Sequence, residues 1–138
     1  MSRRMSVSMT LDAVRSRQKT VTRRHVDTWC NLKPGDRLTL IEKGMGLPKG
    51  AKQVVVAEVE IVDVVVEHIL AIDGDDIYSE GFDPREWPRL EWAAWWARSH
   101  GHRVPDPPHV ADFAGVLCRR IAWRYIDEAD GQLELVAP

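Results

Sequence analysis

The chain has 138 residues and a mass of 15.7 kDa, the size of one domain with a single core. Its composition, 44% hydrophobic and 29% charged, argues against a disordered or fibrous chain. The formal net charge of -2 excludes a strongly basic nucleic-acid coat but leaves room for a local basic patch. We therefore expect a single domain over residues 1–138.

Cysteine content and hydropathy indicate the cellular compartment of the protein. Cys30 and Cys118 are too few for a disulfide scaffold of this size or for a zinc knuckle, and free thiols suit a reducing compartment. No apolar run reaches the ~18 residues of a membrane span. The start, residues 1–8, has two arginines but no apolar stretch after them, unlike a secretory signal. We expect a soluble cytoplasmic protein with no membrane contact.

Charge is segregated along the chain. Residues 1–37 hold nine basic and three acidic residues, whereas residues 58–91 hold eleven acidic and two basic ones. Such an asymmetry either steers an anionic ligand to one face or is neutralised when the two segments meet in the fold. The sequence leaves both interpretations open.

The first half of the chain predicts a short helix and then strands. Thr10 is a candidate N-cap for a helix over Leu11–Arg17, with apolar residues at helical spacing. The β-branched segment that follows is extended, and the Pro-Gly pair before Asp36 makes a turn. An alternating strand over Arg37–Glu42 and a Gly- and Lys-rich loop over Lys43–Gln53 come next.

The second half begins with the strongest strand signal, over Gln53–Glu67, where residues separate into two faces at period two. The triplet 64–66 is either a second strand or a bent continuation of the first. Helices are predicted over Asp73–Gly81 and from Asp83-Pro84 to about Ser99, because acidic residues, Pro and Gly stand at typical helix ends. A Pro-rich loop, a final strand pair or single long strand over Phe113–Ile126, and a tail complete the chain. This order predicts an α+β domain: a small, partly open β-barrel with flanking helices.

One short segment carries residues that suit nucleophilic catalysis. Lys19 and Thr22 are spaced i, i+3, and a threonine hydroxyl is a useful nucleophile only when a base removes its proton. A lysine is such a base when burial or like charge lowers its pKa. On a strand these two side chains point to opposite faces, whereas in a turn or helical bend they can converge, so the catalytic interpretation requires non-strand geometry in this segment. The other interpretation is a phosphate-binding or solvated basic edge.

This segment resembles a known family. Lys19, Thr22 and Arg24 match the G-x-K-x-x-T-x-R signature of the ASCH domain family, in the PUA-like superfold, with Arg17 at the position of the glycine. The turn at 32–36, the long strand, Ser79-Glu80-Gly81-Phe82 and the closing Trp123-Arg124-Tyr125-Ile126 follow in the family's order. The resemblance covers about residues 8–127 and implies a PUA-like barrel.

The resemblance also implies roles for these residues. Family members are described as RNA-associated modules, and one small bacterial branch hydrolyses the amide of N4-acetylcytidine with a Lys–Thr–Glu set. Carried over, Lys19 is the base, Thr22 the nucleophile and Glu80 the third member, which orients Lys19 or shuttles a proton. Arg24 would hold a phosphate or a carbonyl oxygen, or form a salt bridge with an acidic residue.

Aromatic and basic residues suggest ligand contacts. The helical stripe of Trp92, Trp95 and Trp96 is either core or a stacking wall for a base, and Trp29 is a second stacking candidate. The residues we assign to ligand or RNA binding are Arg17, Arg23, Arg24, Trp29, Trp95 and Trp96. The histidines near residue 100, with Cys118, do not have the spacing of a metal site, so we expect no metal and no cofactor.

The sequence leaves two functions open. The first is a hydrolase acting on an acylated nucleoside or a related small amide, which requires Lys19, Thr22 and Glu80 to converge in one pocket. The Lys19 amine should then lie within hydrogen-bond reach of the Thr22 hydroxyl, or one water away. The second is an RNA-binding module, or an RNA-cleaving relative, that uses the basic edge from Arg15 to Arg24 and binds RNA in a salt-dependent way. A nucleoside or RNA is the expected ligand in either case.

Overall fold

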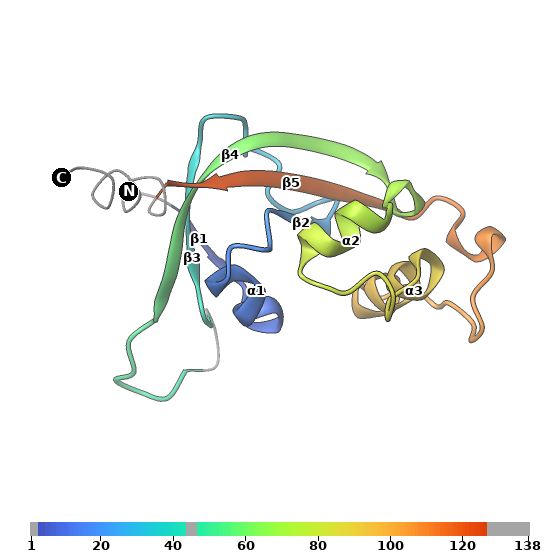
Figure 1. The fold of residues 1–138 in the computed structure, drawn as a ribbon, viewed down its shortest axis with the longest axis horizontal. Coiled ribbons are helices and arrows are strands. Elements are labelled where there is room, and N and C mark those ends of the chain that lie inside the picture. The colour runs from blue at the N-terminus through green and yellow to red at the C-terminus, as the bar shows by residue number, and fades with distance from the viewer. Residues whose placement is uncertain (1–2, 44–46, 127–138) are drawn as a thin grey trace.

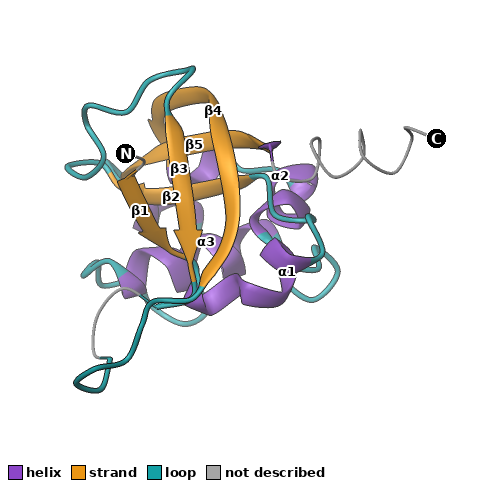
Figure 2. Cartoon of the chain, turned by 90° about the vertical axis from the view of Figure 1, so that its left-hand side faces the viewer, coloured by secondary structure: helices purple, strands orange, loops and turns teal. Residues whose placement is uncertain are grey.

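A computed structural model describes residues 3–43 and 47–126. Five strands form one curved sheet in the order β1-β3-β4-β5-β2, and three helices lie along one side of it (Figures 1 and 2). The strands are β1 (Arg3–Ser6), β2 (Val21–His25), β3 (Arg37–Ile41), β4 (Val55–His68) and β5 (Leu117–Tyr125). The helices are α1 (Leu11–Arg15), α2 (Gly74–Glu80) and α3 (Arg89–Ser99). The architecture is the predicted α+β half-open barrel with flanking helices.

Strand pairing follows from the alternation seen in the sequence. β4 is long enough to pair with β3 along its first half and with β5 along most of its length, both antiparallel. Its inward residues Ala57, Val59 and Ile61 are buried, as the period-two pattern predicts. Residues 64–66 continue the same strand after a register shift between Ile61 and Asp63. The bent-continuation interpretation is therefore confirmed.

Strand β1 has no counterpart among the elements predicted from the sequence. It pairs in parallel with β3, and its sequence, Arg-Arg-Met-Ser, has a single apolar residue. Met5 alone is buried, with 1% of its surface exposed. Four residues with one inward side chain give no periodic signal, so only the tertiary pairing defines this strand.

Helix α3 begins later than the sequence predicts. The Asp83-Pro84 pair predicts a helix from there to Ser99, but residues 84–86 form only a turn and α3 begins at Arg89, after Pro88. A proline disfavours helical geometry in the residue before it, which keeps Trp87 out of the helix. Helix α1 is also shorter than predicted and ends at Arg15, and the Thr10 side chain makes no capping hydrogen bond.

Two apolar clusters divide the interior. One joins the inner faces of β1, β3, β4 and β5 to α1, and includes Trp123 and Tyr125. The other surrounds α3 and includes Ile77 of α2, Trp92 and Trp96. No helix among the described residues is long and apolar enough to cross a membrane.

Gly81 ends α2 in a left-handed conformation, with φ of 108°, that allows α2 to pack against α1. A Cβ at this position would lie 2.8 Å from the Cβ of Ala13. Gly101, which follows α3, has φ of 87° but no atom within 4 Å of such a Cβ. Both glycines therefore have the left-handed backbone conformation, but only Gly81 lacks space for a side chain.

We predict that Gly81→Ala destabilises the fold more than Gly101→Ala. The left-handed conformation costs about 1 kcal/mol at either site, whereas the collision with Ala13 adds to it only at Gly81. Urea unfolding of both variants measures the difference, expected to be about 1–2 kcal/mol. Equal losses of stability would contradict the proposed packing of α2 on α1.

Candidate functional site

The backbone around Lys19 is fixed from several sides. The Lys19 amide donates to the Ala13 carbonyl (3.0 Å), and its carbonyl accepts from Trp123 Nε1 (3.1 Å) and from the Tyr125 hydroxyl. Thr20 continues the anchoring, with its amide on the Ser79 carbonyl (2.9 Å). The segment from α1 to β2 is thus attached to the first apolar cluster and to α2.

Lys19 precedes β2 and lies outside it. The bend comes at Arg17, whose φ of 69° is the left-handed conformation that the family's glycine adopts easily. The Arg17 side chain donates to the Val14 carbonyl (2.9 Å) and lies over the Tyr125 ring (4.7 Å), so it makes contacts no glycine could. Residues 18–20, between this turn and β2, belong to no helix or strand, so Lys19 has the non-strand geometry that the catalytic interpretation requires.

The Lys19 side chain is buried against the end of α2. Its Nζ donates to the Glu80 carbonyl oxygen (2.7 Å) and lies 3.1 Å from Glu80 Oε1. The carbonyls of a helix C-terminus lack intrahelical donors, which makes them good acceptors for an amine. Lys19 and Glu80 each have only 3% of their surface exposed. Burial lowers the pKa of Lys19 below its usual value, although the Glu80 carboxylate opposes this shift.

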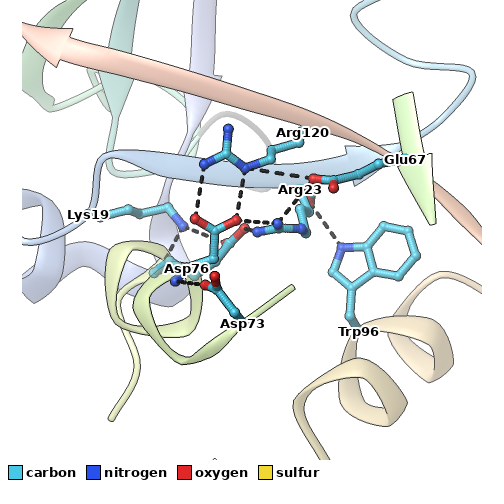
Figure 3. A network of polar contacts seen from close by, with 8 residues as sticks. Lys19, Arg23, Glu67, Asp73, Asp76, Trp96 and Arg120 are labelled. Atoms are coloured by element: carbon cyan, nitrogen blue, oxygen red, sulfur yellow. Dashed lines mark hydrogen bonds and ion pairs between the residues drawn. The ribbon is translucent and has the colours of Figure 1, made fainter. Parts of the chain in front are cut away.

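A network of charged residues continues from Glu80 (Figure 3). Arg23 donates to Glu80 Oε2 (3.1 Å), to Asp76 Oδ2 (2.5 Å) and to Glu67 Oε1 (3.2 Å). Arg120 binds both oxygens of Asp76 at 2.9 Å. The basic N-terminal segment and the acidic middle segment therefore meet and pair, which supports the neutralisation interpretation of the charge pattern.

Residues from both halves of the chain surround one cavity of about 310 Å³. Of the predicted site residues, Lys19, Thr22, Glu80, Arg23, Arg24, Trp95 and Trp96 line it. Arg17 and Trp29 are absent from this lining. Trp29 instead packs against the first apolar cluster, with the Arg3 guanidinium over its ring (5.3 Å).

Thr22 and Arg24 are two residues apart on β2, so their side chains share a face of the strand. Thr22 has 5% of its surface exposed, and its hydroxyl makes no hydrogen bond with any described residue. Arg24 donates from Nη2 to the Ser6 carbonyl (2.8 Å). The candidate nucleophile Thr22 is thus buried, has no hydrogen bond to a described residue, and lines the same cavity as Lys19.

The tryptophan stripe of α3 serves both interpretations made from the sequence. Trp92 and Trp96 are core residues with 1% and 2% of their surface exposed, and Trp96 Nε1 donates to the Arg23 carbonyl (3.0 Å). His100 stacks on Trp96, with ring centroids 4.0 Å apart. Trp95 is only partly buried and, together with Phe82, forms an apolar wall of the cavity.

Several residues of this site were not predicted from the sequence. Ser6 and Ser8 line the cavity because β1 leads into it, and β1 itself gives no sequence signal. Asp76 and Glu67 hold Arg23, and Arg120 in turn binds Asp76; the only sequence signal for the two acidic residues is the segregation of charge, and Arg120 has none. Among the described residues there is no group of three or more His, Cys, Asp or Glu side chains arranged to hold a metal ion.

Asp76 offers a test of the network. Hydrogen bonds from Arg120 and Arg23 lower the pKa of Asp76 from 3.8 to about 2. A carboxylate with a depressed folded pKa stabilises the protein at neutral pH, and this contribution is lost as pH falls from about 4 through 2. Allowing for solvent screening, we expect about 1–2 kcal/mol at neutral pH.

We therefore predict that Asp76→Asn lowers the free energy of unfolding at pH 7 and that the deficit shrinks by roughly half at pH 3. Urea unfolding at the two pH values measures it. Asp75→Asn, at an exposed position of the same helix, is the matched control and should cost less than about 0.5 kcal/mol. A deficit that does not change with pH would contradict the assignment.

Comparisons with known proteins yield structural neighbours only. No family model matches the sequence, and no curated protein matches it. A DUF984 protein from Enterococcus faecalis V583 superposes with a TM-score of 0.57 at 13% identity, over 86% of this chain and 71% of that one. An ASCH domain from Lactobacillus crispatus JV V101 superposes with a TM-score of 0.51 at 15% identity, over 85% and 70% of the two chains. The chain has the fold of an ASCH domain.

Proposed function

We propose that this protein, which has an ASCH-like fold, is an amidohydrolase that cleaves an N-acylated nucleoside such as N4-acetylcytidine. The observation that carries the proposal is that Lys19, Thr22 and Glu80 line one cavity. Lys19 comes from the segment before β2, Thr22 from β2 and Glu80 from the C-terminus of α2. The volume of about 310 Å³ and the mixture of an apolar wall with a few polar groups are typical of a small-molecule site.

The chemistry assigns one role to each residue. Thr22 Oγ attacks the acyl carbon while Lys19 Nζ accepts the hydroxyl proton. The C–N bond then breaks, the proton passes to the leaving amine, and the acyl group remains on Thr22 as an ester. A water molecule, which loses a proton to Lys19, hydrolyses that ester and restores the hydroxyl.

The geometry of Lys19 favours its action as a base. A neutral amine has two N–H groups and one lone pair, and the two oxygens of Glu80 account for both N–H groups. The lone pair of the Lys19 nitrogen is then left to accept the proton of the Thr22 hydroxyl. The desolvation that lowers the pKa of Lys19 raises the fraction of this neutral form.

The RNA-binding alternative has less support from the same residues. Lys19 and Arg23 are buried and paired with carboxylates, so they do not form an exposed cationic edge. Arg15 is exposed but lies 3.5 Å from Glu42. RNA binding that weakens steeply as salt rises would favour this alternative.

Chromatographic detection of cytidine released from N4-acetylcytidine tests the proposed activity. Wild type should release cytidine, and Lys19→Ala and Thr22→Ala should each lower kcat/KM by at least about 100-fold. Thr20→Ala, a threonine outside the cavity lining, is the matched control and should keep wild-type activity. An inactive wild type, or full activity in Thr22→Ala, would sink the proposal.

The pH dependence tests Lys19 separately. Because the neutral amine is the active form, kcat/KM should rise with pH and level off above the pKa of Lys19, which burial places below 10.5. Glu80→Gln removes the attraction that opposes the shift, so the inflection should move to lower pH. NMR titration of Lys19 gives the same pKa without turnover. An inflection that stays in place or moves upward in Glu80→Gln would contradict the role of Lys19.

A further inference from the structure

His100 lines the cavity but has no part in the proposed reaction. It follows the last residue of α3, and its ring stacks on Trp96 with centroids 4.0 Å apart and planes inclined by 19°. Its Nδ1 lies 2.7 Å from the Trp96 carbonyl oxygen. Stacking and this hydrogen bond fix the ring at the end of the helix, so its orientation is set before any ligand enters.

The hydrogen bond decides which ring nitrogen carries the proton. A carbonyl oxygen can only accept, so Nδ1 is the donor, and in the neutral ring Nε2 is then an acceptor. Nε2 forms no hydrogen bond within the described part of the chain and is not among its buried unpaired atoms, so it is open to water or to a ligand. Burial lowers the pKa of His100 below its usual value of 6.5, although the hydrogen bond to Trp96 opposes the shift. The ring is therefore neutral at pH 7.

The cavity runs along α3, and His100 lies at the end away from the reacting groups. At the other end Trp92 contacts Phe82, with ring centroids 5.9 Å apart, and Phe82 follows Glu80 by two residues. His100 comes eight residues after Trp92, about 12 Å along the helix axis. The cation whose charge acts on His100 is Arg24, which lies beyond Thr22 on β2.

An acceptor at this end of the cavity fits one part of an N-acylated nucleoside. The serine hydroxyls of the lining can donate or accept, whereas neutral Nε2 only accepts. When the amide lies between Lys19 and Thr22 and the base against Trp95, the sugar lies on the side of the base opposite the amide. In N4-acetylcytidine the sugar hydroxyls are the hydrogen-bond donors other than the amide N–H. Nε2 is therefore placed to bind one of these hydroxyls.

We propose that His100 is a specificity-determining residue whose Nε2 accepts a hydrogen bond from a sugar hydroxyl of the ligand. The cavity then selects a nucleoside that carries this hydroxyl over its deoxy counterpart. The inference rests on the proposed function for the orientation of the ligand. The acceptor itself rests on the hydrogen bond to Trp96 and on the place of His100 in the cavity.

The state of the ring can be measured without any ligand. ¹⁵N NMR of the histidine side chains at pH 7 should show a neutral His100 with its proton on Nδ1, and His100→Phe assigns the signal. A charged ring, or a proton on Nε2, would overturn the inference, because neither leaves an acceptor at Nε2.

Binding tests the contact, by calorimetry in the Thr22→Ala background to prevent turnover. The probes are N4-acetylcytidine and its 2′-deoxy, 3′-deoxy and 5′-deoxy counterparts. At least one deoxy probe should bind about tenfold more weakly, because Nε2 then has no donor, and that probe identifies the hydroxyl. In His100→Phe, which keeps a ring to stack on Trp96, this ratio should fall to about one. His102→Phe changes a histidine absent from the cavity lining and should leave the ratio unchanged.

The role of His100 would be overturned by any of three results: no binding of any probe, equal affinities for all the probes, or a ratio that survives in His100→Phe. Turnover by wild type distinguishes this failure from failure of the proposed function. A deoxy penalty that depends on His100, without hydrolysis of N4-acetylcytidine, would keep the hydroxyl contact and remove the amidohydrolase. Hydrolysis of all the probes with equal kcat/KM would keep the enzyme and overturn the role of His100.

Discussion

The carboxylate of Glu80 lies between two buried basic side chains, those of Lys19 and Arg23, and the arrangement of the site depends on it. One oxygen lies 3.1 Å from Lys19 Nζ and the other 3.1 Å from Arg23 Nη1. When Lys19 is protonated, the two cations would repel one another in the interior without this carboxylate. Gly81 ends α2 directly after Glu80 in a left-handed conformation, so the C-terminus of this helix forms part of the cavity wall.

The basic N-terminal segment also connects the two apolar clusters through its backbone. Lys19 is attached through its carbonyl to Trp123 of the first cluster, and Arg23 through its carbonyl to Trp96 of the second. The polar residues of the cavity therefore occupy the junction between two packed groups of side chains. Such preorganisation is what a catalytic or binding site needs, because little rearrangement remains to be made when a ligand enters.

Periodicity predicted β4, where one face of the strand is buried, and residues typical of helix ends, Asp73 and Gly81, predicted α2. It failed where tertiary contacts decide, as in β1 and at the start of α3. Lys19 and Thr22 were identified by their residue types and spacing and by the ASCH resemblance, and the turn at Arg17 places Lys19 outside β2. No spacing argument reaches Asp76 or Arg120, because 44 residues separate two side chains that only the packing of α2 on β5 brings together.

The proposed function requires an acylated amine to bind with its acyl carbon between Thr22 and Lys19. A crystal structure of the Thr22→Ala variant grown with intact N4-acetylcytidine tests this directly. We expect the ligand in the cavity, its ring against Trp95, and its acyl carbon about 3–3.5 Å from the position of the missing hydroxyl. A ligand bound elsewhere, or one whose acyl group points away from Lys19, would contradict it.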